Sequence, residues 1–229
     1  MPSTVTCSQP TTVKNDYPLT SDSYAKCIIT GAHTVLRGGL AVACRIPLKL
    51  QLQFTPNPHK QGLIYQGLRN PTAENAFIQF FQHALTLTEA NWSDFSGVIT
   101  LTNTIPLGCG LGSSAALCLT VANLFSQRKI LAQDTKTILQ FAKKLEHFFH
   151  GSSSGLDVVA SRCPAQHIAL FSQESYQYTP ITWHPNLALT PTTIETSTKE
   201  TISLVRQWQA ANPHLAHDID STMHKSSQL

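Results

Sequence analysis

The residues best suited to chemistry in this sequence are three glycines at positions 108, 110 and 112 and the serines that follow them, Ser113 and Ser114. Each glycine weakens a helix or strand by about 0.5 to 1 kcal/mol relative to alanine, so the spacing indicates a backbone that must come close to something. The apolar run of residues 115–125 predicts a buried helix that begins at the serines. A glycine loop that leads into a helix N-terminus presents unpaired N–H groups and the positive end of the helix dipole. The stretch therefore predicts a phosphate-binding site.

The spacing excludes two familiar phosphate-binding loops. No lysine follows Gly112, which excludes the loop of P-loop nucleoside triphosphatases, and the three glycines do not have the spacing of a dinucleotide-binding fingerprint. A tight turn before a core helix is the alternative that a glycine cluster alone leaves open. Other segments of the chain favour ligand binding.

The polar residues between Glu146 and Asp157 form a second candidate segment. Glu146 falls near the end of a predicted helix, where the helix dipole disfavours a carboxylate, and a bound cation would offset this placement. Magnesium takes oxygen ligands and usually keeps water and substrate phosphate among them, so one serine oxygen and one carboxylate are enough protein ligands. The alternative is an ordinary helix end followed by a polar turn.

Residues 106–115 resemble the second motif of the GHMP kinases, the small-molecule kinase family that includes galactokinase, homoserine kinase and mevalonate kinase. The resemblance implies that the loop wraps the triphosphate of ATP and that Ser114 is a magnesium ligand. The ATP-binding residues that it implies are Pro106, Gly108, Cys109, Gly110, Leu111, Gly112, Ser113 and Ser114.

Residues 146–157 resemble the mevalonate kinase version of this family, in which a helix glutamate is followed by His-Gly, then Ser-Gly, then Asp. The resemblance implies that Glu146 is the second magnesium ligand and that Asp157 orients or deprotonates the attacking hydroxyl. It also implies that His150 and Ser154 belong to the substrate pocket.

Residues 24–35 resemble the first motif of the family, in which a lysine precedes a Gly-Glu-His-Xaa-Val turn. The resemblance implies that Lys26 lies near the catalytic Asp157 and that His33 borders the substrate. Lys26 would then hold Asp157 ionised through its opposite charge. The residues alone leave open a snorkelling surface lysine and a structural histidine.

Residues 192–199 resemble the segment in which mevalonate kinases carry Ser/Thr-Thr-Lys at a helix start near the substrate, and this makes Thr198 a substrate-binding candidate. Ser197 and Glu200 also form a capping box, which is a sufficient structural reason for the same residues.

The chain departs from the family pattern at several positions. Ala32 replaces the usual glutamate, Ser153 a proline, Val158 an asparagine and Glu195 a proline. The third family motif is a glycine-rich loop near the C-terminus, and it is missing because Gly155 is the last glycine of this sequence.

Strands and helices must position these groups. Period-two and continuous apolar patterns predict strands at residues 24–30, 40–46, 48–54, 97–104, 166–171 and about 176–183. Caps and helical periodicity predict four helices, which cover residues 71–85 after a cap at Asn70, 113–125, 134–150 and 198–211. Residues 55–67 are expected to form a loop, and the polar tail from His214 is expected to fray.

These elements and the resemblance predict an α+β fold, with a complete N-terminal GHMP kinase domain and an incomplete C-terminal one. The expected units are a polar extension at residues 1–20, a nucleotide-binding domain at 21–180 and a partial C-terminal domain at 181–229. A truncated gene, a partner chain that supplies the rest, and a degenerate paralogue that binds without turnover are three explanations for the missing part.

The composition of the 229-residue chain excludes several classes of partner. A net charge of +3 without Lys/Arg clusters gives no support for nucleic acid, and no apolar run is long enough to span a membrane. The N-terminus has no secretory pattern, and the six cysteines lack paired spacing, so we expect free thiols in the cytoplasm.

The resemblance therefore implies an ATP- and magnesium-dependent kinase that phosphorylates a small alcohol, with mevalonate as the expected acceptor. The alternatives are a phosphomevalonate kinase, a diphosphomevalonate decarboxylase, or a non-catalytic nucleotide- or metabolite-binding paralogue. The oligomeric state stays open, with a homodimer as one option.

Overall fold

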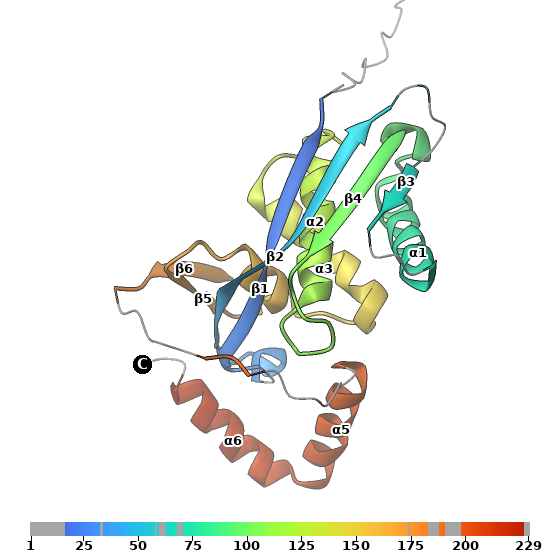
Figure 1. Cartoon of the computed structure of the whole chain (residues 1–229). Helices are drawn as coiled ribbons and strands as arrows, with labels where there is room; N and C mark the ends of the chain where they lie inside the picture. The colour runs from blue at the N-terminus through green and yellow to red at the C-terminus, as the bar shows by residue number, and fades with distance from the viewer. Residues whose placement is uncertain are drawn as a thin grey trace, which may run out of the picture.

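The computed structural model describes residues 17–32, 34–57, 59, 63–67, 71–173, 175–182, 188–190 and 198–226. In this part of the chain, six strands form one mixed sheet (Figure 1). The strands are β1 (Leu19–Thr30), β2 (Ala41–Pro56), β3 (Leu63–Gln66), β4 (Gly97–Asn103), β5 (His167–Phe171) and β6 (Tyr176–Pro180). β3 and β4 run parallel, and the other paired strands are antiparallel.

The long strand β2 organises the sheet. It pairs with β1 over most of its length, with β4 through its C-terminal half and with β5 near its start. Its inward residues Leu50, Leu52 and Phe54 are at most 5% exposed, which confirms the predicted alternation. The strands predicted at residues 40–46 and 48–54 are therefore one continuous strand.

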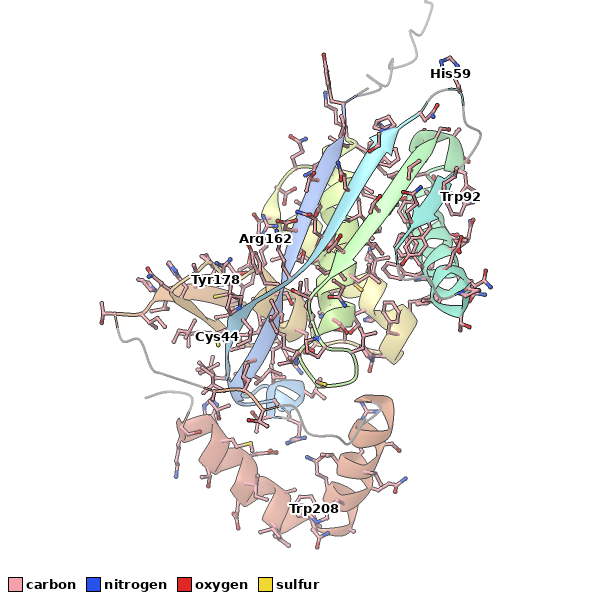
Figure 2. All side chains as sticks on the ribbon, in the orientation of Figure 1. Cys44, His59, Trp92, Arg162, Tyr178 and Trp208 are labelled. Carbon is pink, nitrogen blue, oxygen red and sulfur yellow. The ribbon has the colours of Figure 1, made fainter. Side chains whose placement is uncertain are left out.

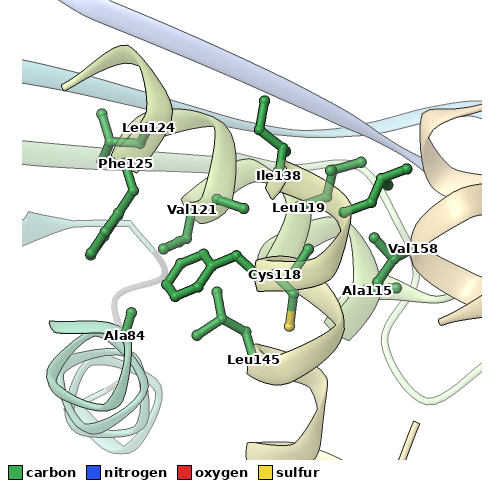
Figure 3. Close-up of a cluster of buried hydrophobic side chains, with 14 of the residues drawn as sticks. Ala84, Ala115, Cys118, Leu119, Val121, Leu124, Phe125, Ile138, Leu145 and Val158 are labelled. Atoms are coloured by element: carbon green, nitrogen blue, oxygen red, sulfur yellow. The ribbon is translucent and has the colours of Figure 1, made fainter. Parts of the chain in front are cut away.

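Four helices complete the N-terminal part of the fold: α1 (Pro71–Thr88), α2 (Ser113–Gln127), α3 (Thr135–His150) and α4 (Leu156–Arg162). Figure 1 shows α2, α3 and α4 together behind the sheet, and α2 contacts both the sheet and α3. Figure 3 shows part of the core between them. The labelled side chains are Ala84, Ala115, Cys118, Leu119, Val121, Leu124, Phe125, Ile138, Leu145 and Val158.

The local signals for α1 and α3 are confirmed. The predicted inner stripe of α1 is buried, and its members are Phe77, Phe80, Phe81, Ala84 and Leu85. Asp134 caps α3 by accepting a hydrogen bond from Thr137 N at 2.8 Å, and Gly151 ends the helix with φ +72°. Phe149 was expected in the inner stripe of α3, but it is 37% exposed because the helix runs past the core there. Asn70, the predicted cap of α1, lies outside the described residues.

Two expectations about loops are wrong. Residues 55–67 contain the short edge strand β3, which prolines and a glycine nearby concealed in the sequence pattern. The polar tail from His214 forms most of a helix, α6 (Pro213–Ser226), after the predicted helix α5 (Thr198–Ala211). Pro213 suits the first turn, and Leu215, Ile219 and Met223 recur at every fourth residue of α6.

The helix α6 is held to the N-terminal part of the fold by polar contacts. The Arg37 guanidinium donates two hydrogen bonds to the carboxylate of Asp220, from Nε to Oδ2 and from a terminal nitrogen to Oδ1. Leu40 N donates to His224 Nδ1 at 3.4 Å, and Ala216 is buried. Figure 2 shows Trp208 on α5, well away from the sheet.

The mixture of helices and sheet confirms the predicted α+β class. The boundaries of the three predicted units stay a prediction. None of the described helices combines the length and the apolarity that a membrane span requires.

Arg37→Ala removes the bidentate pair with Asp220 and should loosen α6 while leaving the sheet intact. Exposed pairs contribute about 1 kcal/mol or less, so we expect a several-fold increase in amide exchange that is confined to α5 and α6. Lys49→Ala is the matched control, because it breaks the 3.2 Å Lys49–Asp22 pair within β1 and β2. Unchanged exchange in α6 of Arg37→Ala would contradict the assignment of Arg37 as its anchor.

Candidate functional site

The glycine loop (residues 106–112) connects β4 to α2, as the sequence predicts. Gly108, Gly110 and Gly112 have φ of +71°, +71° and +74°, a left-handed conformation that other residues rarely adopt. A Cβ atom added at Gly110 would meet no atom within 4 Å. The backbone of the loop is therefore open to a ligand at this point.

The helix α2 begins at Ser113, but Gly112 is its N-cap and no side chain caps it. The first N–H groups of the helix thus have no side-chain acceptor at the cap, and together with the helix dipole they suit an anion. The hydroxyl of Ser114 instead lies 3.0 Å from His150 Nε2. Burial lowers the pKa of His150, which keeps the imidazole neutral near pH 7.

Lys26 connects the strand β1 to this loop through its backbone and its side chain. Its N–H donates to the carbonyl of Leu111 at 3.0 Å, and a Cβ at Gly112 would lie 2.7 Å from Lys26 Cγ. Its ammonium nitrogen lies 3.0 Å from Asp157 Oδ2. Lys26 is 8% exposed, so the alternative of a snorkelling surface lysine is wrong.

Asp157 lies in the first turn of α4, where the helix dipole favours a carboxylate. Gly155 is the N-cap of this helix, with φ +88°, and Ser154 Oγ accepts a hydrogen bond from Leu156 N at 3.2 Å. Ser154 therefore has a structural role at the start of α4. Its predicted role toward the substrate stays a prediction.

Glu146 is a buried carboxylate in the last turn of α3, with 2% of its surface exposed. Burial, and secondly the charge of Asp157, raise its pKa to about 8. The hydroxyl of Ser153 donates a hydrogen bond to Oε2. Within the described part of the chain, no lysine, arginine or histidine forms an ion pair with Glu146.

These donors fit a hard divalent cation. Ser114 and Glu146 line the same cavity, and a bound cation would hold the buried carboxylate ionised. Groups of three or more His, Cys, Asp or Glu side chains with the spacing of a metal cage are absent from the residues that the structure describes. The site therefore suits an ion such as magnesium, which shares its shell with water and phosphate.

One cavity of about 500 Å³ gathers the predicted residues of the site. The predicted site residues that line it are Lys26, Pro106, Gly108, Cys109, Gly110, Leu111, Gly112, Ser113, Ser114, Glu146, His150, Ser154 and Asp157. His33 lies outside the described residues, as do the side chain of Thr198 and its predicted cap Ser197. The individual roles of these residues stay predictions.

Sequence reasoning missed Arg206, which lies on α5 and lines the same cavity. It is a second basic residue in the described lining, 180 positions after Lys26, and no local pattern marks it. Its place follows from the docking of α6, which adjoins α5.

Gly112→Ala should disturb the Lys26–Asp157 pair, because the new Cβ would overlap the Lys26 side chain. Gly151→Ala is a matched control, since Gly151 has φ +72° and no atom within 4 Å of the added carbon. Both variants strain a left-handed residue by about 1 to 2 kcal/mol. We expect a further loss of about 1 to 3 kcal/mol for Gly112→Ala, measured by urea unfolding, because the added carbon overpacks a buried contact. Equal losses in the two variants would contradict the close contact.

Glu146→Gln should change how the stability of the metal-free protein depends on pH. The pKa of Glu146 rises from the ordinary 4.5 to about 8 on folding, so the folded state binds a proton that the unfolded state has released. Wild-type stability should therefore fall as pH rises from about 4.5 to about 8. Glu146→Gln should lose less stability than wild type over this pH range. Urea unfolding at both pH values, with a chelator that keeps the protein free of metal, would measure this. Glu74→Gln, at an exposed position of α1, is the control. Identical pH profiles for wild type and Glu146→Gln would contradict the raised pKa.

Comparisons with known proteins relate this chain to a group of small-molecule kinases. The family model described as "GHMP kinases N terminal domain" matches residues 75–163. Mevalonate kinase of Pyrococcus abyssi is 26% identical over 220 residues, which cover 88% of this chain and 65% of that protein. Mevalonate kinase of Thermococcus sibiricus is 25% identical over 218 residues, with 87% and 65% covered. The chain thus spans about 65% of the length of these curated relatives.

Solved structures share the fold. The L. major mevalonate kinase in complex with R-mevalonate superposes with a TM-score of 0.71 at 18% identity, over 93% of this chain and 68% of that one. The Lactococcus lactis galactokinase complexed with galactose gives a TM-score of 0.61 at 17% identity, over 71% and 47%. The sequence match over residues 75–163 and the shared fold thus make this chain similar to the GHMP kinases, and in particular to their N-terminal domain.

Proposed function

We propose that this chain is an ATP- and magnesium-dependent kinase that transfers the γ-phosphoryl group to the hydroxyl of mevalonate or a closely related alcohol. The observation that carries the proposal is the 3.0 Å pair of Lys26 and Asp157 in the cavity that the glycine loop also lines. A carboxylate paired with a lysine beside an anion-binding helix start has the parts that phosphoryl transfer to an alcohol requires.

The nucleotide side of the site consists of the glycine loop and the start of α2. The backbone N–H groups there bind the triphosphate, because they have no side-chain cap and the helix dipole favours negative charge. Ser114 and Glu146 hold magnesium, which when bound neutralises charge on the phosphates. The left-handed glycines let the backbone follow the phosphates closely.

The acceptor side consists of Asp157 and Lys26. Lys26 pairs with the Asp157 carboxylate at 3.0 Å, and this carboxylate can accept a hydrogen bond from the acceptor hydroxyl and orient it. As the new O–P bond forms and ADP leaves, Asp157 takes the hydroxyl proton and Lys26 stabilises the developing charge. Positioning and electrostatics supply most of the rate enhancement in this type of reaction.

Arg206 and the names of the relatives both support an anionic acceptor. Arg206 adds a cation to the described lining, and the carboxylate of mevalonate would neutralise it. The relatives at 25% and 26% identity carry the name mevalonate kinase. The free cysteines of the described chain suit the cytoplasmic location that we propose with this function.

A chain that binds nucleotide and metabolite without turnover is a second candidate. One sequence feature favours it: Ala32 stands where the family pattern has glutamate. Phosphomevalonate kinase and diphosphomevalonate decarboxylase activities remain alternatives within the enzyme class, because a phosphorylated acceptor would also suit the Arg206 cation.

Asp157→Asn should abolish the reaction while nucleotide binding persists. The variant loses the proton acceptor, so we expect ADP release with mevalonate to fall by about 10²- to 10⁴-fold in a coupled assay. ADP affinity, measured by calorimetry, should stay close to that of wild type. Asp218→Asn, at an exposed position of α6, is the matched control and should keep wild-type turnover.

The same assay separates the candidates. Wild-type protein that binds ADP but releases none from ATP with mevalonate or with phosphomevalonate supports the binding role and overturns the kinase proposal. Full turnover by Asp157→Asn would overturn the role of Asp157.

A further inference from the structure

The hydroxyl of Ser153 is fixed from both sides. It donates a hydrogen bond to Glu146 Oε2 and accepts one from Gly155 N at 3.0 Å. A serine hydroxyl has one proton to donate, so these two bonds fix its orientation.

Glu146 depends on this hydrogen bond. Its carboxylate is 98% buried, and the contact from Ser153 is the hydrogen bond that the described structure gives it. A buried carboxylate without hydrogen bonds is strongly disfavoured and is free to change rotamer. The hydroxyl therefore stabilises the side chain of Glu146 in the position from which it lines the cavity.

The same hydroxyl connects two helices that carry the site. Glu146 lies in the last turn of α3, whereas Gly155 is the N-cap of α4 and precedes Asp157 by two residues. The chain of hydrogen bonds from Gly155 N through Ser153 Oγ to Glu146 Oε2 spans the turn between them. A displacement of Ser153 would move the carboxylate relative to Ser114 on α2.

We propose that Ser153 is a positioning residue for a divalent cation: its hydroxyl holds the Glu146 carboxylate toward the part of the cavity that Ser114 lines, and this raises the affinity of the site for magnesium. The inference rests on the proposed function, in which Ser114 and Glu146 are the magnesium ligands. Partners that orient metal ligands in this way typically change metal affinity by about 10- to 100-fold.

A purely structural role in the turn makes a different prediction. If Ser153 only terminates α3 and starts α4, its loss lowers the stability of the protein and leaves the affinity for metal unchanged. Metal affinity at constant nucleotide affinity therefore separates the two roles.

The test is calorimetric titration of the full chain with Mn²⁺ in the presence of saturating ADP. Ser153→Ala should bind Mn²⁺ about 10-fold or more weakly than wild type, because the carboxylate loses its orienting hydrogen bond. Its metal-free affinity for ADP should be that of wild type. Ser93→Ala, at an exposed position outside the lining of the cavity, is the matched control and should bind Mn²⁺ normally. Ser153→Cys, which keeps the shape with a weaker donor, replaces the alanine variant if that variant does not fold.

A double-mutant cycle with Glu146→Gln makes the test specific. If Ser153 acts through Glu146, the serine substitution adds no further loss of Mn²⁺ affinity in the Glu146→Gln background. Wild-type Mn²⁺ affinity in Ser153→Ala, or fully additive losses in the cycle, overturns this inference alone. A wild-type chain that binds ADP but no Mn²⁺ overturns the proposed magnesium site together with it.

Discussion

The site depends on the way in which Lys26 is held. A lysine that is 8% exposed is costly unless its charge is paired, and Asp157 provides the partner at 3.0 Å. The same residue donates its N–H to Leu111, and its side-chain stem passes so close to Gly112 that a Cβ would not fit. One residue thus fixes β1, the glycine loop and α4 relative to one another. Position 112 therefore requires glycine for two reasons: a Cβ would overlap the Lys26 side chain, and the backbone there is left-handed.

The charges of the cavity favour the cation that we propose. Glu146 and Asp157 are both carboxylates, and among the residues that the structure describes Lys26 forms its ion pair with Asp157. Burial and the neighbouring charge of Asp157 raise the pKa of Glu146, so folding without a cation favours its neutral form. A divalent ion at Ser114 and Glu146 would reverse this preference, because its positive charge would stabilise the ionised carboxylate of Glu146. Metal binding and proton release from Glu146 are therefore linked.

Local signals predicted the glycine loop and the ends of the neighbouring helices, because each signal depends on residues close in sequence. The glycine spacing, the Asp134 cap and the Gly151 stop of α3 were all readable in this way. Contacts that join separate elements were not predicted. The hydrogen bond of Ser153 to Glu146 connects two helices across a turn, and Arg206 lines the cavity from α5, far along the chain from the glycine loop. No periodic pattern records such contacts, and the edge strand β3 was concealed in a segment with several prolines.

The two ends of the cavity come from different parts of the chain, and this separation has a consequence for specificity. The glycine loop, α2 and α4 lie within or next to residues 75–163, the segment that matches the N-terminal domain of the family. Arg206 lies outside that segment, on a helix that the polar contacts of its neighbour α6 hold in place. Because exposed polar contacts are weak, α5 can shift against the sheet more easily than the buried elements around Lys26 can. The proposed phosphate-binding loop accordingly lies on the more tightly packed part of the fold, whereas Arg206, the charge that we propose meets the acceptor, lies on its less tightly packed part.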